Sequence, residues 1–96
     1  MNAFDPNKSK AQAREALLEM AQSYEGKKGM IQHAIEAYKE AIVADPDSGE
    51  AEEAREGLLK IAQKFEKEGK KESAFHLYRM LARELPRGVP SRPVKY

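Results

Sequence analysis

The chain has 96 residues, of which 34% are charged and 41% hydrophobic, and its net charge is +1, a composition that fits one small helical domain. It contains no cysteine, which excludes disulfides, thiolate metal sites and cysteine nucleophiles and is compatible with a reducing compartment. No run approaches the roughly 18 apolar residues of a membrane span. The first ten residues are polar, unlike a signal peptide, so the sequence predicts a cytoplasmic protein.

Four helices are predicted in chain order. They cover about residues 6–24, 30–44, 49–68 and 70–85, and in each the apolar residues recur at spacings of three and four, as on one face of a helix. Short turns separate the first helix from the second and the third from the fourth. The predicted fold is therefore all-α, with two tandem antiparallel helix-turn-helix hairpins.

Proline and capping residues mark the ends of these helices. Asp5 stands before Pro6 as an N-cap, and Pro46 and Pro86 end the second and fourth helices, because proline lacks the amide donor. Asp47 with Glu50 three residues later resembles a capping box for the third helix.

The two hairpins repeat one series of apolar residues. The first copy has Leu17, Met20, Ala21, Tyr24, Ala34, Tyr38 and Pro46; the second has Leu58, Ile61, Ala62, Phe65, Ala74, Tyr78 and Pro86. This series resembles the tetratricopeptide repeat over nearly the whole chain. The resemblance implies a domain of residues 1–86, with repeats at about 7–46 and 47–86. Residues 87–96 are basic and contain two prolines and a glycine, so they are expected to form a short disordered tail.

The repeated residues are expected to form the core of the domain. The alanines are small enough to let the helices of each hairpin approach closely, and the larger side chains form one buried stripe per helix. Ala13, Ala41 and Ile42 are expected to turn inward as well. The predicted repeat core is Leu17, Met20, Ala21, Tyr24, Ala34, Tyr38, Leu58, Ile61, Ala62, Phe65, Ala74 and Tyr78.

The resemblance also implies a concave groove lined by the first helix of each repeat. A ligand there would meet an apolar strip, two amides and four carboxylates, which favours a peptide with Lys or Arg beside a hydrophobic side chain. The alternative is that Leu18 and Leu59 pack as ordinary helix residues. The predicted groove residues are Glu15, Leu18, Gln22, Glu25, Glu56, Leu59, Gln63 and Glu66.

A second candidate surface is the last helix, which is more apolar than its counterpart. Leu77, Met80, Leu81 and Leu85 are expected to form an exposed terminal face, whereas terminal repeats usually have a polar outer face. Three alternatives remain for what covers this face: the tail folding back through Val89, Val94 and Tyr96, a second copy of the chain, or another protein.

Charge is distributed unevenly along the chain. Residues 1–59 hold 7 basic against 12 acidic residues, a balance of −5, and residues 60–96 hold 10 against 4, a balance of +6. These charges are either solvated helix faces or a polarity that favours head-to-tail self-association or an acidic partner.

The sequence offers no site for catalysis, metal or cofactor. His33 and His76 stand alone, and no nucleophile has a plausible base. The basic tail with its Pro90 and Pro93 pair, and the lysines of residues 60–71, are weak signals for polyproline recognition and for nucleic acid. The sequence thus predicts a non-enzymatic adaptor that binds another protein or peptide, with neither membrane nor nucleic acid as partner. The alternative is a structural module acting as an end-to-end homodimer or as a small subunit of a larger assembly.

Overall fold

The computed structural model describes residues 6–85, and this part of the chain is all-helical, as predicted. The helices are α1 (Pro6–Glu25), α2 (Ile31–Ala44), α3 (Gly49–Lys67) and α4 (Lys71–Arg79), which continues into the π-helical turn η1 (Met80–Glu84). The bounds of the first three helices lie within one residue of those predicted. The tail, together with Pro86 and the Asp5 cap, lies outside the described residues.

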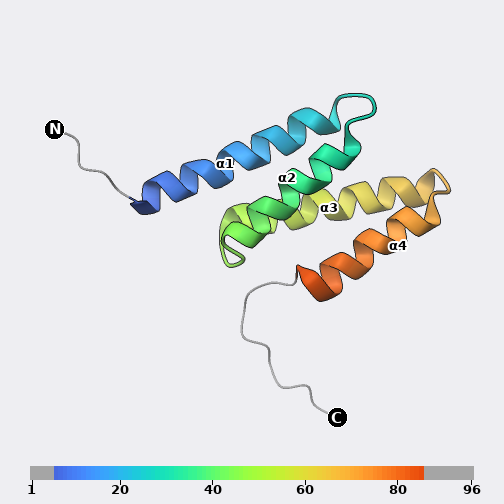
Figure 1. The fold of residues 1–96 in the computed structure, drawn as a ribbon. Helices are drawn as coiled ribbons and strands as arrows, with labels where there is room; N and C mark the ends of the chain where they lie inside the picture. The colour runs from blue at the N-terminus through green and yellow to red at the C-terminus, as the bar shows by residue number, and fades with distance from the viewer. Residues whose placement is uncertain (1–5, 86–96) are drawn as a thin grey trace, which may run out of the picture.

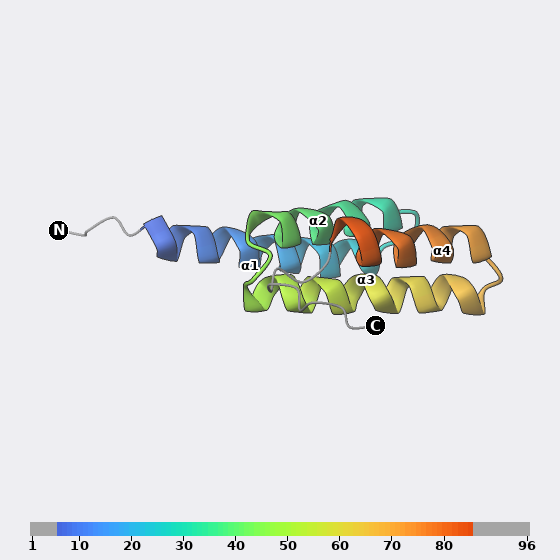
Figure 2. The ribbon, with the colours of Figure 1, turned by 90° about the horizontal axis from the view of Figure 1, so that it is seen from below.

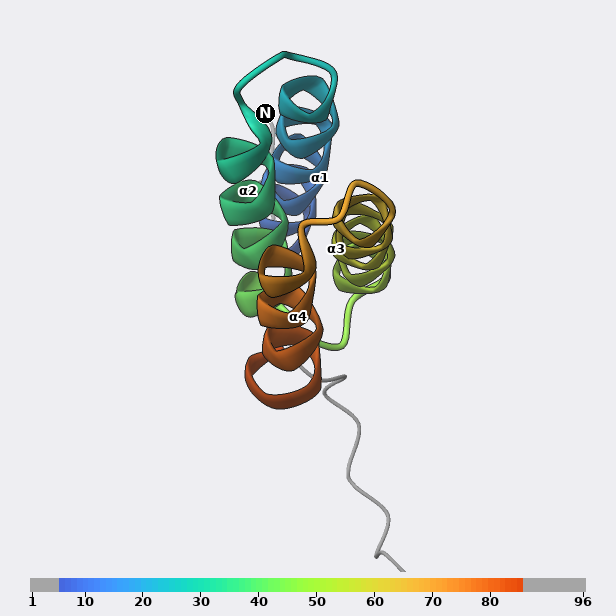
Figure 3. The ribbon, with the colours of Figure 1, turned by 90° about the vertical axis from the view of Figure 1, so that its right-hand side faces the viewer.

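The helices form two antiparallel hairpins, α1 with α2 and α3 with α4 (Figure 1). Views from below and from the side show two layers, with α1 and α3 in one and α2 and α4 in the other (Figures 2 and 3). Helix α3 packs against each of the other three helices. The second hairpin is therefore held on the first mainly through α3.

Both hairpin turns contain a glycine in the left-handed backbone region. Gly29 has a φ of 78° between α1 and α2, and Gly69 has a φ of 81° between α3 and α4. Residues with a Cβ rarely adopt this conformation. At the second turn the Lys70 amide donates to the Phe65 carbonyl at 2.8 Å and the Gly69 amide to the Glu66 carbonyl at 3.0 Å, the two bonds of a Schellman helix end.

The link between the repeats differs from the prediction in one detail. Helix α2 ends two residues before Pro46, as expected, but the N-cap of α3 is Ser48 and not Asp47. The Ser48 hydroxyl accepts from the Ala51 amide at 3.0 Å and donates to the Asp45 carbonyl at 2.8 Å. Serine thus both caps α3 and holds the linker, so the predicted capping box with Glu50 is wrong.

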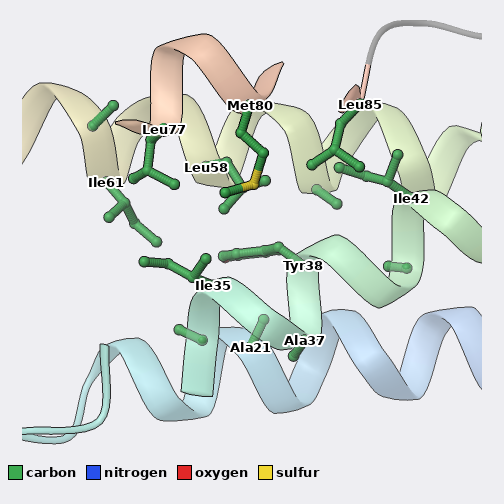
Figure 4. Packing of buried hydrophobic residues seen from close by; sticks show 14 of the residues in the cluster. Ala21, Ile35, Ala37, Tyr38, Ile42, Leu58, Ile61, Leu77, Met80 and Leu85 are labelled. Atoms are coloured by element: carbon green, nitrogen blue, oxygen red, sulfur yellow. The ribbon is translucent and has the colours of Figure 1, made fainter. Parts of the chain in front are cut away.

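The core runs between the two hairpins, where small and large side chains alternate (Figure 4). Most of the predicted repeat core is buried, while Leu17, Tyr24 and Tyr78 are half-buried. Met20 is 45% exposed and Ala13 is also exposed, so the prediction that they turn inward is wrong. Leu18 is buried in the core instead of Met20 and Ala13. Among residues 6–85 no helix packs against the side of α1 that carries Met20.

The end of the last helix also departs from the prediction. Leu77, Met80 and Leu85 are buried, and only Leu81 of the predicted terminal face remains half-buried. The π-helical turn explains the burial of Leu85, because the Leu85 amide donates to the Met80 carbonyl, five residues back, at 2.9 Å. The wider turn aligns Leu85 with buried Met80, where an α-helix would align it with Leu81. The exposed apolar face predicted there is therefore wrong.

Candidate interaction surface

The second hairpin repeats polar contacts of the first as well as its apolar pattern. First helices correspond at an offset of 41 residues and second helices at 40. The Tyr38 hydroxyl donates to Glu25 at 3.0 Å, and Tyr78, its counterpart, donates to Glu66 at 2.8 Å. Each contact fastens the second helix of a hairpin to the first.

Two equivalent arginines fasten the ends of the hairpins. Arg14 on α1 lies 3.7 Å from the Asp45 carboxylate, and its Nε donates to Glu50 on α3 at 3.0 Å. Arg55 on α3 donates from Nε to the Leu85 carbonyl at 3.1 Å, the position that corresponds to Asp45. The hydrogen bond from Arg14 holds the pKa of Glu50 below its ordinary value, so this carboxylate is ionised when it bridges the two repeats.

The close contact between the repeats is the Tyr38 ring on Gly57. A Cβ at Gly57 would stand 2.4 Å from the ring's Cζ atom, so only glycine lets α3 approach this far. Tyr38 is buried, and this burial, together with the hydrogen bond to Glu25, raises the pKa of its phenol. The first repeat thus offers a tyrosine surface that α3 covers.

On the second repeat, the surface equivalent to the one that α3 covers on the first repeat is exposed within the described part of the chain. Leu18 is 4% exposed and its counterpart Leu59 is 39% exposed. Ile35 is 5% exposed and its counterpart Phe75 is 60% exposed. Since the positions correspond, the difference is the cover that the second repeat gives to the first. We call Leu59, Phe75, Tyr78 and Leu81 the second-repeat face.

Basic side chains border the second-repeat face. The Arg79 guanidinium lies over the Phe75 ring, 5.1 Å from its centre. An open hollow around this ring is lined by Lys71, Glu72, His76 and Arg79 with Phe75 itself. Lys71 stands where α2 has Ile31, so this face is less apolar than the one buried inside the chain.

The predicted groove is only partly available. Leu18 is buried in the core, so the prediction that it lines an open groove is wrong; it packs under the second hairpin. Leu59 is exposed, as are the carboxylates and amides of the groove apart from Glu25, which is half-buried beneath the Tyr38 hydroxyl. The apolar strip therefore reduces to Leu59, which also belongs to the second-repeat face.

The residues that sequence reasoning missed share one signal. Arg14 and Arg55 occupy the same register, and so do Ile35 and Phe75, so a comparison of every position with its counterpart would have identified them. His33 lies against the Tyr24 ring, with ring centres 5.2 Å apart, and His76 lines the hollow at Phe75. Within residues 6–85 no three His, Asp or Glu side chains gather as metal ligands.

In the part of the chain that the structure describes, no helix is long and apolar enough to cross a bilayer. Comparison of the chain with protein-family models, with characterised proteins and with solved structures gave no match.

Proposed function

We propose that this protein is a non-enzymatic binding module, built from two tetratricopeptide-like repeats, that receives an amphipathic helix on its second-repeat face. The observation that carries the proposal is the contrast between equivalent positions: Leu18 and Ile35 are buried in the core beneath the second hairpin, while Leu59 and Phe75 are exposed. The absence of cysteine fits the cytoplasm as its compartment.

The chain itself indicates what chemistry the partner helix needs. Helix α3 fits the first repeat with a glycine over the tyrosine ring and an apolar residue, Ile61, four positions later. A partner for the second-repeat face should likewise carry a small residue over Tyr78 and an apolar residue one turn on. Burial of the Phe75 and Leu59 side chains would contribute about 1.5–3 kcal/mol each if complete.

A synthetic peptide of the α3 sequence, Gly49–Lys67, tests this proposal directly. Titrated into the isotope-labelled full chain, it should bind saturably and shift the resonances of Leu59, Phe75 and Tyr78. Because a helix of this length is only marginally stable alone, binding should also raise its helicity.

Two variants make the peptide experiment specific. Phe75→Glu should weaken peptide binding at least about tenfold, or about 1.4 kcal/mol. Val43→Glu places the same charge at an exposed apolar residue outside the second-repeat face and should leave binding unchanged. Absence of binding, or equal binding by the two variants, would refute the proposed function.

A further inference from the structure

We propose that the occupant of the second-repeat face is helix α1 of another copy of this chain, docked as α3 docks on the first repeat. This inference rests on the proposed function and adds the identity of the partner. It follows from the surface that α1 leaves uncovered.

Helix α1 carries an uncharged stripe where α3 carries its docking face. The α3 residues that face the first repeat, among them Ala54, Gly57 and Ile61, correspond to Ala13, Ala16 and Met20 on α1. With their polar neighbours these residues cover an arc of roughly 100° around the helix. We call this set the α1 stripe; all its members are exposed, and they are Ser9, Gln12, Ala13, Ala16, Met20 and Ser23.

The stripe and the second-repeat face match residue by residue. In the chain, Ile61 of α3 and Ile35 of α2 point toward one another (Figure 4). Their counterparts are Met20 and Phe75, which are both large, apolar and exposed. Docking of α1 would place the Met20 thioether against the Phe75 ring, a favourable contact.

One difference between α1 and α3 should make the interface between copies less tightly packed than the interface between the hairpins of one chain. Ala16 stands where α3 has Gly57, and a Cβ at Gly57 would meet the Tyr38 ring at 2.4 Å. The Ala16 methyl therefore keeps α1 farther from Tyr78, or displaces its ring, which is half-buried in the free chain. Association between copies should accordingly be weak and reversible.

Charge favours the same orientation. Glu15 and Glu19 border the α1 stripe, whereas the hollow at Phe75 is lined by Lys71 and Arg79 together with one carboxylate, Glu72. Among the described residues, 6–59 hold 7 basic against 11 acidic residues and 60–85 hold 7 against 4, so unlike ends attract and like ends repel. When the α1 stripe of one copy docks on the second-repeat face of another, the resulting dimer still has one free α1 stripe and one free second-repeat face. The same contact therefore adds further copies, unless its rotation closes a ring.

The test is the solution mass of the full chain by light scattering, from about 1 μM to about 1 mM. The wild-type mass should rise with concentration beyond a dimer. Met20→Glu and Phe75→Glu should each stay monomeric, because each removes one of the two faces. Their matched controls, Gln22→Glu on the other side of α1 and Val43→Glu on α2, should associate like the wild type.

Mixing the two defective variants makes the test decisive. Met20→Glu retains an intact second-repeat face and Phe75→Glu an intact α1 stripe, so an equimolar mixture should form a dimer and nothing larger. A wild type that is monomeric throughout overturns the proposal. The proposal is also overturned if Phe75→Glu abolishes association while Met20→Glu does not, because two second-repeat faces would then be paired with each other.

Failure of this inference can be told apart from failure of the proposed function. The Met20→Glu chain should still bind the Gly49–Lys67 peptide, because its second-repeat face is unchanged. Peptide binding by a wild type that remains monomeric would leave the function standing and exclude a second copy as its partner.

Discussion

Two tyrosines at equivalent positions of the two repeats differ in burial and in the cause of their raised pKa, because their neighbours differ. Tyr38 and Tyr78 both donate to a glutamate on the preceding helix, yet Tyr38 is buried under α3 and Tyr78 is half-buried. Burial is the main cause that raises the pKa of Tyr38, whereas for Tyr78 the hydrogen bond to Glu66 is the main cause.

This contrast predicts a difference in stability that depends on pH. Tyr38→Phe should cost about 0.5–1.5 kcal/mol at pH 7, the net contribution of one hydrogen bond, and Tyr78→Phe should cost less. The folded-state pKa of Tyr38 lies above its ordinary value of 10.0, so its contribution is complete below pH 10 and declines as pH rises further.

Urea unfolding at pH 7 and at pH 11 measures both effects. The gap between the wild type and Tyr38→Phe should narrow at pH 11, because the wild type then retains a proton that its unfolded chain releases. A gap that stays constant would show that the phenol is not held protonated in the folded protein.

At the scale of the element, α3 owes its position to Gly57. Gly57→Ala should destabilise the fold by about 1–2 kcal/mol, because the new methyl meets the buried Tyr38 ring, and this outweighs the better helix propensity of alanine. Gly49→Ala is the matched control, since a Cβ there meets nothing within 4 Å. Equal stability of the two variants in urea unfolding would contradict the close approach of α3 to α2.

The bounds of the helices were predictable from the sequence. Which side of each helix is buried was less predictable. Periodicity, Pro46 and Gly69 fixed the bounds of the first three helices within one residue. The phase of α1 was wrong at Leu18 and Met20, because alignment to the second repeat assumed that α1, like α3, is covered on both sides.

The candidate face was predicted only in part, at Leu59 and Leu81. No local pattern signals the π-helical turn that buries Leu85, so the sequence placed the exposed apolar residues at the end of the last helix. Among residues 6–85 the exposed large apolar residues are Met20, Val43, Leu59 and Phe75. Leu59 was predicted as a groove residue, whereas Phe75 was not predicted, and comparison with its buried counterpart Ile35 identifies it.

At the scale of the whole molecule, the two repeats show both halves of one contact. The buried half joins α3 to the first repeat, and the open half consists of the second-repeat face at one end and the α1 stripe at the other. The opposite charge balances of residues 6–59 and 60–85 favour the proposed head-to-tail orientation of two copies. The proposed docking of α1 on the second-repeat face would add further helices by the interaction that already joins the two hairpins of the chain.

The most direct test of this account is the contact between Met20 and Phe75 across two copies. Chains with labelled methionine methyl groups, mixed with unlabelled chains, would be studied by isotope-filtered NMR. A cross-peak from the Met20 methyl of one copy to the Phe75 ring of another is the predicted result, with buried Met80 giving none. Intermolecular cross-peaks from the Met20 methyl to residues outside the second-repeat face, or no intermolecular cross-peak at concentrations of about 1 mM, would contradict head-to-tail docking.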